Sequence, residues 1–352
     1  MKTTVRQHLR GFSLIELLVS IAMGLAILLV VLTMFQNMTS NSKLGQVQQR
    51  MSEDAQAAFQ LIGQEMRQAG FNPIQTRTTT PERNDLSGKS ATEFAMPIFG
   101  CSTGFANGKG TGAAAHIGQL TCNASGGTES FAVQYEADSY SPNVVTVANT
   151  PADCRGAAVV AKSQQLRNAA NTVVGTAAYW VVENRYFIDG SGLNCVGNGG
   201  TPTFAGFAQP LVRNIEKMEL KYGLAQPTNS AVTKGTDSKS ISGYLLANQI
   251  GAASGTIDAG TVDVSFSTAA PAIVPSQRWS KLVKTVRLCL VVKGDSPVLD
   301  QDFTPAAANR TYGYYYGCSP EGATDAIAIT DRYPRRSFFM HYALRNNTHL
   351  NY

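Results

Sequence analysis

The sequence has few charged residues. Asp, Glu, Lys and Arg make up 15% of its 352 residues, whereas soluble domains contain about 25%. The net charge is only +5, and without residues 1–11 it would be +2, from 26 basic and 24 acidic residues. Nucleic-acid-binding proteins carry concentrated positive charge. The composition therefore argues against that class and suits an exported protein better than a cytosolic enzyme.

Motifs typical of enzymes and metal sites are also missing. There is no Cys-x-x-Cys pair, and His116, His341 and His349 do not have the spacing of zinc ligands. No Gly-x-Ser-x-Gly sequence is present, which excludes the nucleophile elbow of α/β-hydrolases. We therefore expect no catalytic, cofactor or metal site, and no enzymatic function.

The longest apolar run covers residues 12–35 and reads FSLIELLVSIAMGLAILLVVLTMF. As a helix it would be about 36 Å long, enough to cross a hydrocarbon core of roughly 30 Å. Lys2, Arg6 and Arg10 precede it, and residues 36–42 carry no charge. The positive-inside rule then places the N-terminus in the cytoplasm and everything beyond the run outside it. The run is too long for an ordinary secretory signal and has no small-residue cleavage site after it.

Glu16 is the one charged residue inside this segment. A carboxylate within hydrocarbon costs roughly 2.5–3.5 kcal/mol or more, so we expect Glu16 to have a positively charged partner. Arg10 is one candidate, because its long side chain can reach in from the membrane interface. Cleavage between Gly11 and Phe12 would create another candidate, the α-amine of Phe12.

The residues around Glu16 closely resemble the class III signal of type IV prepilins and type II secretion pseudopilins. A basic leader ends at Gly11, and residues 12–19 read FSLIELLV. The resemblance implies that a prepilin peptidase cleaves after Gly11 and methylates the amine of Phe12. It also implies that Glu16 pairs with the Phe12 amine of a neighbouring subunit during assembly. The i to i+4 spacing of Phe12 and Glu16 leaves a pair within one helix open as well.

Beyond the membrane segment, apolar residues recur at steps of three and four, the pattern of one helical face. They are Leu44, Val47, Met51, Ala55, Ala58, Ile62, Met66 and Ala69. The opposite face is predicted to be polar and to contain Gln48, Arg50, Glu53, Asp54, Gln60, Gln64, Glu65 and Arg67. Gly70 and Pro73 mark the expected helix end. The sequence therefore predicts one continuous stalk helix of about 87 Å, with a transmembrane part at 12–35 and a periplasmic part at 36–70.

Residues 71–352 are predicted to form a β-rich head, so that the fold class is α+β with a long helix packed on a pilin-like head. Alternating apolar residues predict strands at 130–136, 143–147, 177–188, 215–222, 261–266, 285–293 and 337–344. Residues 72–129 are rich in glycine and are predicted to be irregular, and residues 72–209 as a whole are treated as a loop-rich insertion. Residues 223–260 are predicted to be a connection with one short helix.

All six cysteines follow the membrane segment, in what is predicted to be an oxidising compartment, and disulfides are expected there. They are Cys101, Cys122, Cys154, Cys195, Cys289 and Cys318. Six cysteines allow many pairings, and the sequence does not choose among them. Pairing of sequence neighbours, Cys101 with Cys122, Cys154 with Cys195 and Cys289 with Cys318, is one arrangement.

Two surface clusters remain open to interpretation. The run Tyr312-Gly313-Tyr314-Tyr315-Tyr316 is either an adhesive or partner-binding surface or part of half-buried strands. A basic cluster of Arg332, Arg335 and Arg336 either contacts an acidic partner or is the solvated start of a strand. The weak net charge gives no support to a specific nucleic-acid partner.

Three segments of the head resemble minor pilins of the PilW type. Residues 211–223 end in Tyr-Gly, residues 279–292 form a following strand, and residues 335–346 close with Leu-Arg-Asn. The resemblance implies a minor pilin that joins other minor pilins and the major pilin in a tip or priming complex. Such a complex initiates type IV pilus assembly and supports twitching motility.

Further partners implied by the resemblance are a PilY-type tip adhesin and the inner-membrane assembly platform. The protein would be a single-pass inner-membrane protein before assembly and part of the pilus fibre at the cell surface afterwards. Two alternatives share the stalk chemistry. One is a minor pseudopilin of a type II secretion system, and the other is a signal-anchored periplasmic enzyme.

Overall fold

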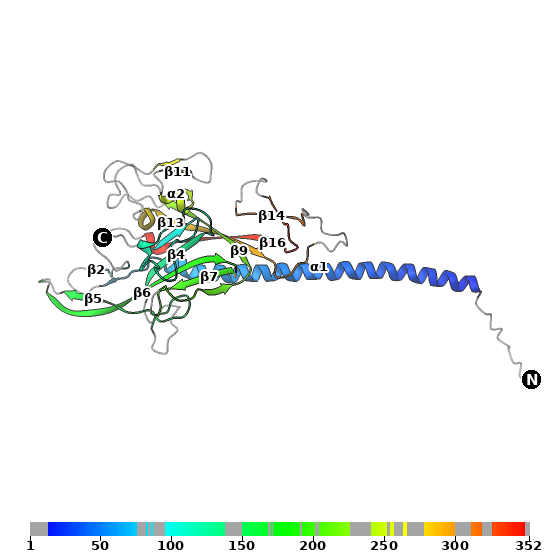
Figure 1. The fold of residues 1–352 in the computed structure, drawn as a ribbon, viewed down its shortest axis with the longest axis horizontal. Coiled ribbons are helices and arrows are strands. Elements are labelled where there is room, and N and C mark those ends of the chain that lie inside the picture. Colours follow the sequence, from blue (N-terminus) through cyan, green and yellow to red (C-terminus); the bar gives the residue numbers. More distant parts are fainter. Residues whose placement is uncertain are drawn as a thin grey trace, which may run out of the picture.

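The molecule consists of a long helix and a β-rich head in the computed structural model. The structure describes residues 13–75, 82–83, 86, 96–137, 150–167, 170, 172–190, 192–200, 204–225, 241–251, 254–256, 263–265, 278–299, 311–318 and 326–348. Helix α1 (Leu14–Gln68) has 55 residues. Its first half leaves the head as a free rod, and its second half lies against the head (Figure 1). The helix ends at Ala69, before Gly70, whose φ of +73° suits a glycine at a helix end.

Two antiparallel sheets form the body of the head. The six-stranded sheet has the order β3-β4-β6-β7-β8, with β5 paired to β6. Its strands are β3 (Ile98–Cys101), β4 (Ser130–Ala137), β5 (Lys162–Arg167), β6 (Val173–Asp189), β7 (Gly192–Gly197) and β8 (Gln209–Val212). The four-stranded sheet has the order β10-β9-β13-β16. Its strands are β9 (Ile215–Ala225), β10 (Ile241–Leu245), β13 (Val283–Lys293) and β16 (Arg335–Ala343).

Short elements complete the head. Three two-stranded pairs lie outside the main sheets: β1 (Ile74–Gln75) with β2 (Glu82–Arg83), β11 (Ser254–Thr256) with β12 (Asp263–Ser265), and β14 (Tyr314–Tyr316) with β15 (Ala326–Ala328). Helix α2 is Ala247–Gly251, a π-helical turn covers Arg278–Leu282, and 3-10 turns cover Ile117–Gln119 and Arg345–Thr348.

The main core lies between the stalk helix and the two sheets. The predicted helical stripe is buried from Val47 to Ala69, and only Leu44 at its start is half-buried. On β13 the alternate residues Val286, Leu288, Leu290 and Val292 belong to the same core cluster, as expected for a strand with one buried face. The head therefore holds the helix through apolar residues that repeat with the helical and the strand period.

The α+β class is confirmed, and the head is more ordered than its composition suggests. Strands lie at or near the predicted 130–136, 177–188, 215–222, 285–293 and 337–344, and β12 lies within the predicted 261–266. The predicted strand at 143–147 lies outside the described residues. The segment predicted to be loop-rich, 72–209, contains most of the six-stranded sheet. Strand β7 could not be predicted, because its sequence, GLNCVG, has a glycine at each end and no apolar alternation. It forms because pairing with neighbouring strands overrides local propensity.

Candidate functional site

The most unusual surface of the molecule is the free half of α1. Every residue at positions 14–38 is exposed, including large apolar side chains from Leu14 (77% exposed) to Met38 (72% exposed). Within the described residues, α1 is the one helix long and apolar enough to cross a membrane. Soluble proteins rarely leave such a surface in water. This segment requires lipid or other apolar helices around it.

Glu16 lies at the start of this segment, and its side chain turns back toward the helix N-terminus. The backbone N–H of Ser13 donates to Oε2 of Glu16 at 3.3 Å. This contact satisfies one of the backbone donors that a helix leaves free at its first turn. The candidate partners Arg10 and Phe12, and the cleavage position Gly11, lie outside the described residues.

The second half of α1 is joined to the head by a buried acid. Glu65 was predicted to lie on the polar face of the helix, and this is wrong, because its side chain is buried against the six-stranded sheet. Asn184 Nδ2 donates to Glu65 Oε1 at 3.0 Å. The pKa of Tyr186, on the same strand, is raised well above its usual value by burial and then by the Glu65 carboxylate. Glu65 therefore fixes the position of the helix on strand β6.

Two contacts from the C-terminal part of the chain hold the same half of the helix. The hydroxyl of Tyr342 on β16 donates to the carbonyl oxygen of Phe59 at 2.7 Å. Asn346 Nδ2 donates to the carbonyl oxygen of Arg67 at 2.9 Å, where the helix leaves carbonyl groups free. A Cβ at Gly63 would lie 2.9 Å from the ring of Tyr342, so this glycine lets the strand approach the helix closely.

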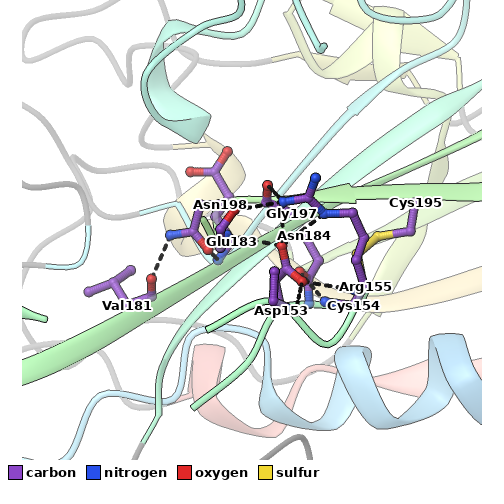
Figure 2. Close-up of polar contacts among 11 residues, drawn as sticks. Asp153, Cys154, Arg155, Val181, Glu183, Asn184, Cys195, Gly197 and Asn198 are labelled. Carbon is purple, nitrogen blue, oxygen red and sulfur yellow. Dashed lines mark hydrogen bonds and ion pairs between the residues drawn. A yellow bond between two sulfur atoms is a disulfide. The ribbon is translucent and has the colours of Figure 1, made fainter. Parts of the chain in front are cut away.

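A polar cluster beside strand β6 involves the same Asn184 side chain (Figure 2). Asp153 accepts from the guanidinium of Arg155, with Nη2 at 2.8 Å, and from the backbone N–H of Gly199 at 3.0 Å. The backbone N–H of Cys154 donates to Asn184 Oδ1 at 2.9 Å, and Cys154 is disulfide-bonded to Cys195 of β7. The same Asn184 side chain thus connects the cluster to Glu65 of the stalk.

A second buried pair lies next to this cluster. Arg185 Nη2 lies 2.7 Å from Glu183 Oε1, and the guanidinium donates to the carbonyl oxygens of Gly108 and Ala114, each at 2.8 Å. Burial raises the pKa of Glu183 and lowers that of Arg185, and in each case the partner's charge opposes the shift. Their bonds tie the glycine-rich segment 108–114 to β6.

These residues were missed by sequence reasoning, although a signal was present. Glu183, Asn184 and Arg185 interrupt an apolar run inside the predicted strand at 177–188. Polar residues on both faces of a strand indicate buried bonds to other elements. The residues that they bond are far away in the sequence, so the sequence of this strand does not predict them.

All six cysteines form disulfides. The structure joins Cys101 to Cys122, Cys154 to Cys195 and Cys289 to Cys318, so each cysteine is bonded to its neighbour in sequence. Two of the bonds lie within the six-stranded part of the head, and the third connects β13 to Cys318, just after β14. Among the residues that the structure describes, no three His, Cys, Asp or Glu side chains form a group that could hold a metal ion.

The two surface clusters differ in their exposure. Tyr314 and Tyr316 are 69% and 66% exposed, whereas Tyr315 packs against Cys289 and Cys318. In the basic cluster, Arg335 pairs with Glu216 and Asp331, and Arg332 donates to the carbonyl oxygen of Leu299 at 3.2 Å. The tyrosines therefore form a surface, while two of the three arginines are bonded within the head.

A membrane-capable helix that is free at its N-terminal half and docked on a disulfide-bonded β-rich head defines a pilin-like protein. A family model described as Type IV Pilus-assembly protein W matches residues 178–346, from within β6 to the 3-10 turn after β16. This match supports a PilW-type type IV pilus protein with a part in type IV pilus assembly. The match includes the three head segments in which the resemblance was seen. No curated protein and no solved structure matched the chain.

Proposed function

We propose that the protein is a minor pilin that enters a priming complex at the tip of the type IV pilus and so initiates assembly. The observation that carries this proposal is the division of α1. Residues 14–38 are mostly apolar and are all exposed, whereas from Val47 onward one face of the helix is buried in the head. A free apolar rod leaves the membrane only when other rods cover it. Assembly into a fibre supplies that cover.

Processing at the N-terminus prepares this step. A prepilin peptidase cleaves after Gly11 and methylates Phe12, so that the mature helix begins with a positive amine. The Glu16 carboxylate is turned toward this end of the helix by its contact with the Ser13 N–H. Each charge is costly alone in lipid, and a pair offsets part of both costs. Pairing with the amine of a neighbouring subunit sets the register between stalks.

Incorporation into a pilus fibre implies particular binding partners. PilW-type proteins interact with other components of pilus assembly. We assign here the other minor pilins, the major pilin, the inner-membrane assembly platform and a PilY-type adhesin at the tip. Residues 12–35 anchor the protein in the inner membrane with the head in the periplasm, until the fibre carries it to the cell surface. Twitching motility and adhesin display then depend on its presence.

The test is the substitution Glu16→Ala. Without the carboxylate the neighbouring amine has no partner, and we expect the amount of protein in sheared pili, relative to the membrane, to fall at least about tenfold. Thr33→Ala, in the same segment, serves as the matched control. Entry of the Glu16→Ala protein at the wild-type level would refute the role of the carboxylate.

Mass spectrometry of the mature N-terminus tests processing separately. The expected chain begins at a methylated Phe12. A chain that keeps residues 1–11 in cells would contradict the pilin proposal and favour a signal-anchored protein.

A further inference from the structure

Strand β16 is the outer strand of the four-stranded sheet. Just beyond its ends, the Leu344 N–H donates to the carbonyl oxygen of Lys284 at 2.8 Å, and the Gly294 N–H donates to that of Pro334 at 2.7 Å. The register between β13 and β16 is unbroken, so even-numbered residues of β16 bond to β13. Hydrogen bonds alternate along an antiparallel strand. The N–H and C=O groups of the odd-numbered residues therefore point away from the sheet.

Beyond Arg335 and Arg336 at the start of β16, this edge lacks the usual protection. Natural edge strands are short, bulged or interrupted by charges and proline. Residues 337–343 read SFFMHYA, without proline or a Lys, Arg, Asp or Glu side chain. Phe339 and Met340 are 39% and 40% exposed. Across the described residues, no other strand pairs with this side of β16.

Apolar surface continues beyond the edge onto the β14–β15 hairpin. Tyr314, Tyr316 and Ile327 are exposed there. The hydroxyl of Ser337 donates to the carbonyl oxygen of Tyr316, and the Cys289–Cys318 disulfide holds the end of β14 on the sheet. The edge strand and the hairpin thus form one apolar surface with free backbone groups in it.

The direction of β16 relative to the stalk indicates what binds there. Its first residues lie near the Val47 end of the docked helix, since Val47 and Pro334 both lie beside Gly294. Its far end lies near Arg67, which Asn346 contacts. β16 therefore runs alongside α1 in the same direction (Figure 1). A subunit whose stalk packs in parallel against residues 14–38 would carry its own head next to this head, where one of its strands can reach this edge.

We propose that the β16 edge binds an extended strand from the head of a second, non-identical pilus subunit by β-strand addition; this rests on the proposed function. Antiparallel pairing is the more stable form. If two copies paired through β16 in this way, their stalks would point in opposite directions, which a single membrane does not allow. The bound strand must therefore run against the direction of its own stalk, unlike β16.

Photo-crosslinking in piliated cells tests the partner. Benzoylphenylalanine is placed at Phe339, at Val174 on the exposed part of β6 as a control, and at Leu28 in the stalk. We expect Phe339 and Leu28 to crosslink to pilus subunits identified by mass spectrometry, and Val174 not to do so. A crosslink at Leu28 without one at Phe339 would overturn the edge proposal and leave the pilin function intact. Failure at both positions would count against the function itself, and a crosslink from Phe339 to a second copy would overturn the non-identical partner.

A matched pair of variants tests the backbone contribution. His341→Pro removes one outward N–H without taking a bond from the β13 ladder, and proline is tolerated at sheet edges. His341→Ala removes the same imidazole and keeps the N–H. We expect co-purification of the partner with the full chain from solubilised membranes to fall at least about tenfold for His341→Pro and to change little for His341→Ala. Equal binding by both variants would contradict strand addition.

A second pair covers the case in which His341→Pro does not fold, as judged by loss of the Cys289–Cys318 bond. Phe339→Lys introduces the charge that natural edges use against pairing, and Phe339→Leu keeps the site apolar. Partner binding lost in Phe339→Lys and kept in Phe339→Leu supports the proposal. Binding kept in both variants refutes it.

Discussion

At the residue scale, Glu129 is a carboxyl group between the two sheets. It precedes β4, and its Oε2 accepts from the backbone N–H of Leu220 on β9 at 2.9 Å. Burial is the largest cause that raises its pKa from 4.5 to about 8, while the bond to Leu220 opposes the shift. The proton therefore stays on the folded protein at neutral pH, where the unfolded chain has lost it. The contribution of Glu129 to stability is then greatest below pH 4.5 and falls as the pH rises toward 8.

Glu129→Gln is expected to remove this pH dependence. The amide keeps an acceptor for the Leu220 N–H and carries no titrating proton. Between pH 4.5 and 7 the wild type should lose about 3 kcal/mol of unfolding free energy relative to the variant, at 1.36 kcal/mol for each pH unit. Urea unfolding of both proteins at several pH values measures this, with the exposed Glu53→Gln as control. A difference that does not grow with pH would contradict the assignment.

At the scale of elements, the β14–β15 hairpin depends on one covalent bond to the sheet. Cys289 and Cys318 are both buried, with Tyr315 packed against them. The outer residues Tyr314 and Tyr316 remain exposed. The disulfide thus attaches the hairpin covalently to the sheet, next to the hydrogen bond from Ser337 to Tyr316.

The double substitution Cys289→Ala with Cys318→Ala tests this dependence. The bond spans 29 residues, and closing such a loop contributes about 3–4 kcal/mol in the chain-entropy account. We expect a loss of this size in unfolding free energy and earlier proteolysis between residues 299 and 326. The single variant Cys289→Ala also lacks the bond and should show a loss of similar size. Equal protease resistance of the double variant and the wild type would show that the hairpin is held by other contacts.

At the scale of the whole molecule, the head and the free half of α1 are suited to different surroundings. The head buries α1 only from Val47 onward, so its core does not depend on residues 14–38. The rod has no apolar partner within the described chain. The same helix is therefore a structural part of the head at one end and a membrane or fibre element at the other.

Two truncations are expected to separate these roles. A chain that begins at Lys43 keeps the whole docked stripe and should be soluble and folded, whereas the full chain should sediment with phosphatidylethanolamine–phosphatidylglycerol vesicles. A chain that begins at Ala55 also lacks Val47 and Met51 and should lose several kcal/mol of stability, since each large buried side chain contributes about 2–5 kcal/mol. Vesicle sedimentation and urea unfolding measure the two effects. Equal stability of both truncations would show that the helix is not part of the core.

Some elements could be predicted from the sequence and others could not. Strand β13 follows from its alternation of Val286, Leu288, Leu290 and Val292, because one buried face imposes the strand period. Strand β7 and the order of the sheets do not follow, because GLNCVG has no such alternation and gains its order from pairing with β6. Glu65 was misplaced because a helical stripe identifies apolar residues, and a buried acid depends on a distant partner such as Asn184.

The sequence by itself determined the parts that depend on local periodicity and on a contiguous motif: the membrane-capable helix, its docked stripe, the lone acid at Glu16 and the α+β class. Only the tertiary structure decided which side of the helix holds Glu65, which cysteines meet, and that β16 lies at an open edge. These features depend on contacts between residues far apart in the chain. Apolar spacing is encoded within a few turns of one segment, whereas a buried bond or a free edge exists only once the other segments are in place.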